Sequence, residues 1–226
     1  MISAKEIVAT IVLLSWVIFV VSYVTKRLYE IMRRRGLKHN VAVYYNRKII
    51  HILAGGLCAI IVPFIYDTPI LPSVMAMLLS VFTYIPHRTK RLMYWFQTEE
   101  NTYEVSFCIM WGIIITMGWL ISGGDFWFGV VPILFMSIGD AITGVVRNKL
   151  YKRRNKSWWG NLAMAIFSIP TGGILGTAGM IAGAIASIIE HFEFGPVDDN
   201  VMVPLASFIT IVLAKYYAPW LLIMRI

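Results

Sequence analysis

Long apolar runs dominate the chain and are separated by short polar segments. Eight of them approach the roughly 17–25 residues that a helix needs to cross a bilayer. They lie at about 6–25, 49–66, 69–86, 105–122, 126–146, 158–175, 176–190 and 202–220. The pattern therefore predicts an all-α, polytopic transmembrane helical bundle of about seven to eight helices.

The sixth and seventh runs are interrupted by helix-breaking residues, namely Pro170, Gly172, Gly173 and Gly176. This stretch is compatible with two helices, or with one broken helix and a re-entrant piece, since irregular backbone is tolerated where protein surrounds it. Broken helices also occur in transporters, so a transporter is one alternative.

The composition agrees with lipid as the solvent. Charged residues make up 14% of the chain and mean hydropathy is +0.72, whereas soluble domains carry about 25% charged residues. We expect a single integral membrane domain over 1–226, in which 1–46 form a leading transmembrane helix plus a basic cytoplasmic segment. The two cysteines lie in apolar runs, so neither a disulfide nor a zinc site is expected.

Basic residues gather in three polar segments: between the first and second runs, the third and fourth, and the fifth and sixth. If each run spans, these segments meet at one face, which the positive-inside rule makes cytoplasmic. An even helix count then places the N-terminus outside. The same rule explains the net charge of +8 without nucleic acid as a partner. The expected location is the cell membrane or the endoplasmic reticulum membrane.

Several acids reach the same face, although the positive-inside rule does not require them there. They include Asp140, Glu190, Asp198 and Asp199. Glu104, in the link before the fourth run, is expected simply to be solvated. Acids and cations together at one face suit a charged, water-soluble substrate that reacts with a lipid, at an active site facing the cytoplasm.

The first polar grouping is Arg47, Lys48 and His51, followed by Gly55-Gly56. Arg47 and His51 lie four residues apart, so they share one helix face. Either cation is a candidate phosphate ligand. Alternatively, the cations snorkel to the headgroups while His51 bonds to a neighbouring helix. The glycine pair indicates close helix packing.

The second grouping begins with Asp140, a carboxylate at the end of an apolar stretch. Such a residue is costly in a membrane and marks a candidate functional site. Arg147 follows on the same face, and Lys149, Lys156 and Ser157 lie beyond it. A carboxylate beside cations suggests a metal-bound polyphosphate, with Mg²⁺ on the acid and phosphate on the bases. A structural Asp140–Arg147 pair is the alternative.

The third grouping is Glu190 with Asp198, Asp199 and Asn200. Carboxylates and an amide are suitable oxygen ligands for Mg²⁺. The alternative is helix capping, because Asp and Asn favour the N-cap and Pro204 would follow in the first turn.

These groupings, in this order, resemble the CTP-dependent lipid kinase family, which includes dolichol kinase, phytol kinase and the CTP-dependent diacylglycerol kinases. The family's Arg-Lys-x-x-His-x-x-x-Gly motif is matched from Arg47, and its Gly-Asp-Ala segment from Gly139. Its Lys-Ser/Thr-x-Glu-Gly-Ser/Thr stretch is matched in part from Lys156. Its Glu, with Asp-Asn-x-x-Val/Ile-Pro some eight residues later, is matched by Glu190 and from Asp199.

The resemblance covers roughly 47–205, with two departures. Trp159 stands where the family often has Glu, and Asn161 where it often has Ser or Thr. The Lys156-Ser157 pair is intact, but the loop lacks a candidate metal ligand.

The resemblance implies transfer of the γ-phosphoryl group of CTP to a membrane isoprenoid alcohol (dolichol/polyprenol, geranylgeraniol or phytol type), giving a lipid phosphate and CDP. Diacylglycerol is a less favoured acceptor. The residues expected to hold Mg²⁺ are Asp140, Glu190, Asp199 and Asn200. Those expected to bind phosphate are Arg47, Lys48, Arg147, Lys149, Lys156 and Ser157. The catalytic base stays open among Asp140, Asp198 and His51.

Two rival functions remain. A cytidylyltransferase that forms a CDP-lipid would also need CTP, Mg²⁺ and a membrane, but its late His-Gly-Gly followed by Asp-Arg does not occur in this sequence. A transporter would place its site near the bilayer midplane, whereas the charges here are predicted at one face.

Overall fold

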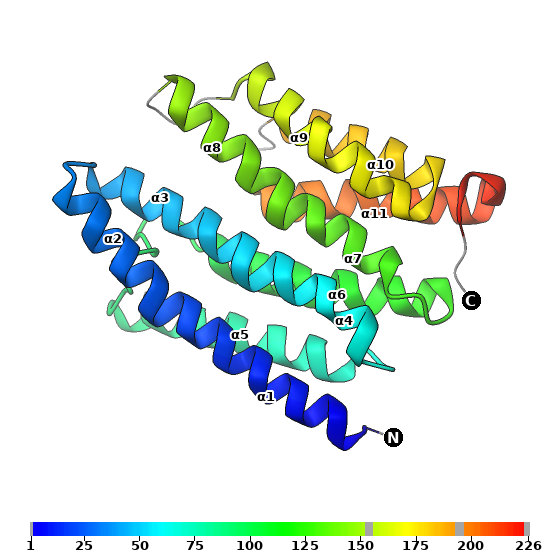
Figure 1. The fold of residues 1–226 in the computed structure, drawn as a ribbon, viewed down its shortest axis with the longest axis horizontal. Helices are drawn as coiled ribbons and strands as arrows, with labels where there is room; N and C mark the ends of the chain where they lie inside the picture. The colour runs from blue at the N-terminus through cyan, green and yellow to red at the C-terminus, as the bar shows by residue number, and fades with distance from the viewer. Residues whose placement is uncertain (1, 152–155, 193–196, 224–226) are drawn as a thin grey trace.

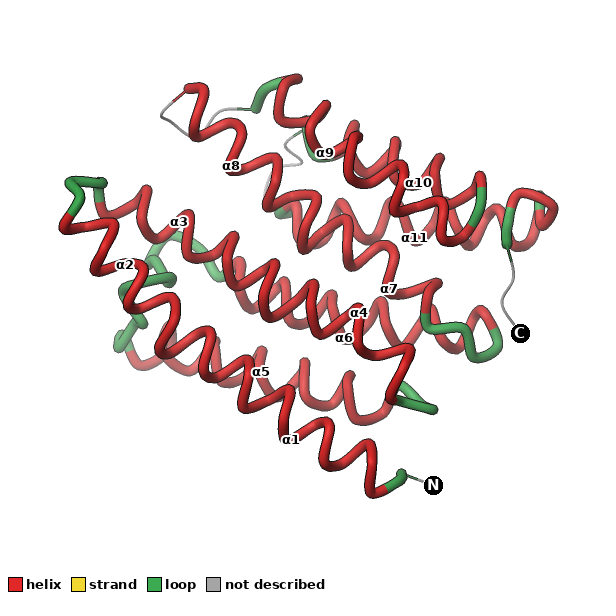
Figure 2. The backbone as a smooth tube through the Cα atoms, in the orientation of Figure 1, coloured by secondary structure: helices red, strands yellow, loops and turns green. Residues whose placement is uncertain are grey.

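Helices account for almost the whole fold in the computed structural model of this chain (Figure 1). The structure describes residues 2–151, 156–192 and 197–223. Within these ranges, eight helical segments run back and forth through one bundle, and no β-strand occurs (Figure 2). The predicted all-α class and the helix number are confirmed.

Three of the eight segments contain a π-helical turn and carry two labels each. They are α1 (Ala4–Phe19) with α2 (Thr25–Arg34), α3 (His39–Ile50) with α4 (Leu57–Ile65), and α7 (Trp127–Leu134) with α8 (Asp140–Tyr151). The other five segments are α5 (Ile70–Thr89), α6 (Tyr103–Ser122), α9 (Trp158–Gly172), α10 (Thr177–Ile189) and α11 (Asp199–Tyr217).

Six helices in the described part of the chain are long and apolar enough to cross a membrane. The protein is therefore an integral membrane protein. At a rise of 1.5 Å per residue, α9 and α10 are only about 20–23 Å long, whereas the hydrocarbon core of a bilayer is roughly 30 Å thick. They run as a short pair beside the longer spans.

The first two spans are longer than predicted. The first continues to Arg34 and the second begins at His39, so only a short turn at 35–38 separates them. The basic part of 1–46 is thus mostly helical, where the sequence analysis expected a link. Lys and Arg are good helix formers, so a helix continues through them beyond the apolar run.

The interruption near Pro170 is the turn between two antiparallel helices, α9 and α10, so two helices are observed in this stretch. Gly176 adopts a positive φ of 81° and reverses the chain between α9 and α10. The two helices approach so closely that a Cβ on Gly172 would collide with the backbone of Gly179. Small residues permit this contact, as in many membrane helix pairs.

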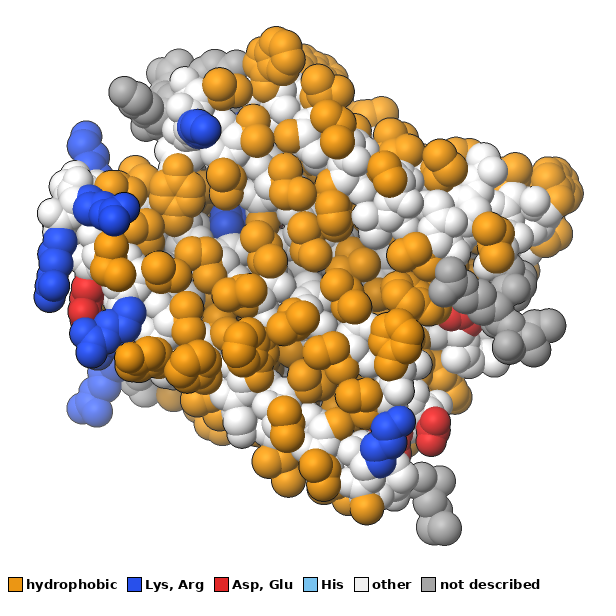
Figure 3. Space-filling view, in the orientation of Figure 1, with side chains coloured by type: hydrophobic (Ala, Val, Ile, Leu, Met, Phe, Trp, Pro, Cys, Tyr) orange, Lys and Arg blue, Asp and Glu red, His pale blue; other side chains and the backbone are white. Residues whose placement is uncertain are grey.

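The fifth span, Trp127–Leu150, is the centre of the bundle, because 78% of its apolar window is buried. Asp140 lies within this segment, surrounded by the other helices. Lys and Arg side chains gather at the end of the molecule where α2 meets α3 (Figure 3), and both termini lie at the opposite end (Figure 1). The basic residues are therefore concentrated at one end of the bundle, as predicted.

Candidate functional site

Three carboxylates from distant parts of the chain meet at the basic end of the bundle. Asp140 begins α8, Glu190 directly follows α10, and Asp199 lies in the first turn of α11. One oxygen from each lies within 4.8 Å of the others. The second and third predicted groupings thus form one cluster.

Each carboxylate has a cationic partner. The Lys48 Nζ donates to Oδ2 of Asp140 at 2.6 Å, and the guanidinium of Arg147 pairs with Glu190. Lys156 donates to Asp199 at 2.9 Å and to the backbone carbonyl of Glu190 at 2.5 Å. The alternative Asp140–Arg147 pair is therefore wrong.

Two π-helical turns bring the first grouping to Asp140. One covers His51–Gly56 and the other Phe135–Gly139, and they pack against each other. A Cβ on Gly55 would collide with the ring of Phe107, and one on Gly56 would meet Ile138. The packing role predicted for this glycine pair is confirmed. Such turns inside α-helices frequently accompany functional sites.

Two further glycines leave room for the cations. A Cβ on Gly144 would lie 2.7 Å from Cε of Lys48, and one on Gly160 would lie 2.6 Å from Nε of Arg147. Both glycines therefore let a basic side chain pass close to a helix on its way to a carboxylate.

His51 is buried beside the cluster. Its Nδ1 lies 3.7 Å from Oδ2 of Asp140, and its ring stacks on Phe107 with centroids 4.1 Å apart. The histidine therefore lies where charged side chains give way to apolar ones.

Asp198 and Asn200 lie close to the cluster but face other partners. The Oγ of Ser106 donates to Asp198 at 2.5 Å, and the amide of Asn200 donates to the backbone carbonyl of Tyr103 at 2.9 Å. Asp140, Glu190 and Asp199 thus form the carboxylate cluster, while the Nδ2 of Asn200 is hydrogen-bonded to the start of α6.

The donor set fits Mg²⁺, which prefers oxygen ligands at about 2.1 Å, so that opposite ligands are roughly 4.2 Å apart. One oxygen from each carboxylate lies within 4.8 Å of the others. To hold one ion, at least two of the three pairs would close to adjacent octahedral positions, about 3.0 Å apart. Burial raises the pKa of Glu190 to about 7, although Arg147 and Lys156 act to lower it. Burial also raises the pKa of Asp198. A nearby divalent cation would favour the ionised form of both.

Three expected phosphate ligands are placed elsewhere or already engaged. Lys149 is exposed on α8, and the Ser157 hydroxyl caps α9 by accepting from the backbone N of Gly160. Arg47 donates to the Phe96 carbonyl at 2.7 Å and to Asn101 at 2.9 Å. Lys48, Arg147 and Lys156 are the expected cations that meet the carboxylates.

The departures from the family motif have a structural meaning. Trp159 is exposed at the outer surface of α9, so a carboxylate there would not reach the cluster in this arrangement. Asn161 points inward, and its amide donates to the carbonyl of Ser187 and lies 3.4 Å from Glu190. Asn161 therefore helps to position Glu190, which sequence reasoning missed.

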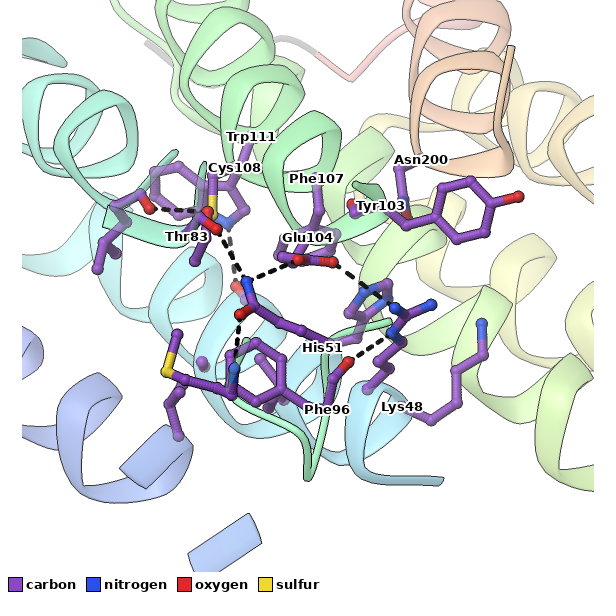
Figure 4. Close-up of a pocket in the computed structure, with 18 of the residues that line it drawn as sticks. Lys48, His51, Thr83, Phe96, Tyr103, Glu104, Phe107, Cys108, Trp111 and Asn200 are labelled. Atoms are coloured by element: carbon purple, nitrogen blue, oxygen red, sulfur yellow. Dashed lines mark hydrogen bonds and ion pairs between the residues drawn. The ribbon is translucent and has the colours of Figure 1, made fainter. Parts of the chain in front are cut away.

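A second buried polar cluster was also missed, and the expectation that Glu104 is solvated is wrong. The Oε1 of Glu104 lies 2.5 Å from Nε2 of His87 and accepts from Gln97 at 2.8 Å. Its Oε2 lies 3.8 Å from Arg47. Figure 4 shows Glu104 of this cluster beside the loop that carries Phe96. The cluster ties the 90–101 loop to α3, α5 and α6. A Glu at the start of an apolar run, opposite a His at the end of the preceding one, was the available signal.

A cavity of about 2050 Å³ joins the charged cluster to the membrane-embedded part of the bundle. At its charged end lie Lys48, Asp140, Arg147, Glu190 and Asp199. Its other part is lined by apolar residues of α1, α4, α5 and α6, among them Trp111 and Cys108 (Figure 4). The cavity therefore suits an amphiphile with a polar head and an apolar chain.

Comparison with protein families, curated proteins and solved structures finds no match to this chain. The resemblance to CTP-dependent lipid kinases consequently depends on the three motifs and on their meeting at one site.

The Glu104 cluster makes a testable prediction. Glu104→Ala leaves the partly buried Arg47 and His87 without this carboxylate, and losing one partner of a fully buried pair costs about 3–5 kcal/mol, which is an upper bound here. We expect the 90–101 loop to open, so that trypsin cleaves after Lys90 and Arg91 at least tenfold faster. The exposed Glu99→Ala is the control and should cleave as the wild type does. Equal rates for both variants would show that Glu104 does not hold the loop.

Proposed function

We propose that this protein is a CTP-dependent kinase that phosphorylates the hydroxyl of a membrane isoprenoid alcohol, giving a lipid phosphate and CDP. The observation that carries the proposal is the cavity, in which three carboxylates paired with three cations open into an apolar chamber. Mg²⁺, bound by Asp140, Glu190 and Asp199, would neutralise phosphate oxygens of the nucleotide.

The ion pairs of the cluster suggest how the nucleotide binds. Lys48, Arg147 and Lys156 each hold a carboxylate that is a metal ligand in the proposal. When metal and polyphosphate enter together, the acids exchange their cations for the metal, and the freed cations turn to phosphate oxygens. The buried charges thus remain paired before and after binding, which avoids the cost of an isolated buried ion.

His51 is the base that the geometry favours among Asp140, Asp198 and His51. Asp140 is engaged by Lys48, and Asp198 accepts from Ser106, while His51 lies between the carboxylates and the apolar chamber. An alcohol oxygen placed there would attack the γ-phosphorus as the bond to the β-phosphate breaks. Its proton would pass to the imidazole, and CDP would leave.

The choice of CTP is supported only by the family resemblance. The site supports a metal-bound polyphosphate, and the apolar chamber supports an acceptor with a hydrocarbon chain. The distinction from a cytidylyltransferase depends on which phosphorus reacts.

Product analysis tests the reaction. Purified protein in lipid nanodiscs, incubated with CTP, Mg²⁺ and a panel of isoprenoid alcohols, should release CDP and form one lipid phosphate per CDP. Replacing CTP by ATP should remove most of the activity. Release of pyrophosphate would instead identify a cytidylyltransferase, and equal rates with both nucleotides would contradict the family assignment.

Asp140→Asn tests the metal site. The variant should lose at least 10³-fold in kcat and bind Mn²⁺ more weakly by paramagnetic resonance, because an amide replaces a carboxylate ligand at the phosphoryl transfer site. Asp67→Asn, at the other end of the bundle, is the control and should be fully active. Asp140→Asn also weakens the ion pair with Lys48 and could destabilise the fold. The double variant Asp140→Asn/Lys48→Met removes the unpaired lysine, so its folding shows whether the loss of the pair destabilises the bundle. Near-normal turnover of Asp140→Asn would exclude Asp140 as a ligand.

His51→Gln tests the base. General base catalysis contributes about 10²–10⁴-fold, so kcat should fall by this factor while KM for CTP changes little. The limb of the pH–rate profile that reports deprotonation of the base should also disappear. Asp198→Asn should keep that limb. The opposite result, with the limb lost only in Asp198→Asn, would assign the base to Asp198.

A further inference from the structure

The apolar part of the cavity is a chamber of defined length. It is lined on the first span by residues from Thr10 to Val21, and on the second span and its end by residues from His51 to Tyr66. The lining positions recur every three or four residues, so each helix turns one face to the chamber. At 1.5 Å per residue these stretches are about 17 and 23 Å long. The apolar chamber is therefore about 20 Å deep.

Polar contacts close the far end of the chamber. Thr10 and Tyr66 both line it, and their hydroxyl groups are hydrogen-bonded at 2.9 Å. Beyond them, Glu6 is buried and accepts from the backbone N of Asp67 at 3.0 Å. These bonds fix α1 to the turn between α4 and α5 and form the floor of the chamber.

The chamber opens sideways between α1 and α5. Ile18, Leu78 and Phe82 line it and are 45–65% exposed on the outer surface of the bundle. Two residues before Ile18, α1 is held by Trp16, whose Nε1 donates to the carbonyl of Leu53 at 2.8 Å. A lipid could enter from the bilayer through this side without crossing the charged end.

We propose that the chamber binds the hydrocarbon chain of the acceptor and that the Thr10–Tyr66 floor sets the preferred chain length. An extended chain advances by roughly 1.25 Å per carbon, so about 20 Å holds about 16 main-chain carbons. This is the length of a four-isoprene alcohol, and a polyprenol of ten or more units would have to leave through the side. The inference rests on the proposed function, because it places the reacting hydroxyl beside His51.

Chain length alters binding through packing. A chain in the bilayer is already out of water, so the chamber gains mainly from close contacts. A shorter chain leaves part of the chamber unfilled, and a longer chain must bend at the floor. Affinity should therefore pass through a maximum near four isoprene units, about fivefold or more above two and above eleven units.

Two pairs of variants test the chamber by binding alone, without nucleotide or metal. Cys58 lines the chamber on α4, while Ile60 of the same helix is exposed and is not part of the lining. Cys58→Phe should move the maximum to two or three units, whereas Ile60→Phe should leave it at four. Tyr66→Ala opens the floor and should favour longer chains, with Phe64→Ala as its control on the exposed surface.

The experiment measures competition of alcohols with two, three, four and eleven isoprene units against a radiolabelled four-unit alcohol in nanodiscs. A second measurement uses the wild type, so it does not depend on a variant that folds. A four-unit alcohol with a photoreactive terminal group should label residues around Tyr66. Binding that is independent of chain length, or terminal labelling at exposed residues such as Phe64, would overturn the proposal.

The two proposals fail separately. A maximum at four units without CDP release would retain the chamber and reject the kinase. CDP release at equal rates for all chain lengths, with no binding maximum, would retain the kinase and reject the chain-length limit.

Discussion

The ion pair between Lys48 and Asp140 is the interaction on which the rest of this structure depends. An ionised carboxylate in the most buried span of a membrane bundle is stable only with a partner of opposite charge. Lys48, 92 residues earlier in the chain, donates to Asp140 at 2.6 Å. This pairing requires the turns His51–Gly56 and Phe135–Gly139 to approach closely, and the glycines of the first turn permit it. Once α3 is fixed against α8, the remaining acids and bases can pair around the same point.

The other two ion pairs extend this constraint to the C-terminal half. Arg147 reaches Glu190 and Lys156 reaches Asp199, so the ends of α8 and α10 and the start of α11 are held together by charge. Removing Glu190 would leave the buried Arg147 without this carboxylate, and an uncompensated buried ion is strongly destabilising. The site and the packing at this end of the bundle are consequently one structure, which explains how short helices such as α9 and α10 are retained in it.

Much of the fold could be predicted from the sequence, because in lipid the length of an apolar run directly measures a span. The helix ends could not, since Lys and Arg continue α2 beyond the apolar run. The four-residue spacing predicted that Arg47 and His51 share one helix face, and both residues line the cavity. It could not identify pairs across the bundle, so Arg147 was considered for Asp140 and not for Glu190. Glu104 was missed because its burial depends on a loop that folds back from α5.

The shape of the cavity supports the proposed kinase, which must bring two substrates together, over a transporter, which needs a path through the bundle. Its charged end is reached from the basic face, and its apolar end opens to the bilayer between α1 and α5. In this conformation the lining stops at Thr10 and Tyr66, with Glu6 bonded to the next turn behind them. A transported solute would need a path past that floor, whereas a lipid needs only the side opening. In the proposed reaction the nucleotide and the lipid would meet at His51, and neither would have to cross the environment that suits the other.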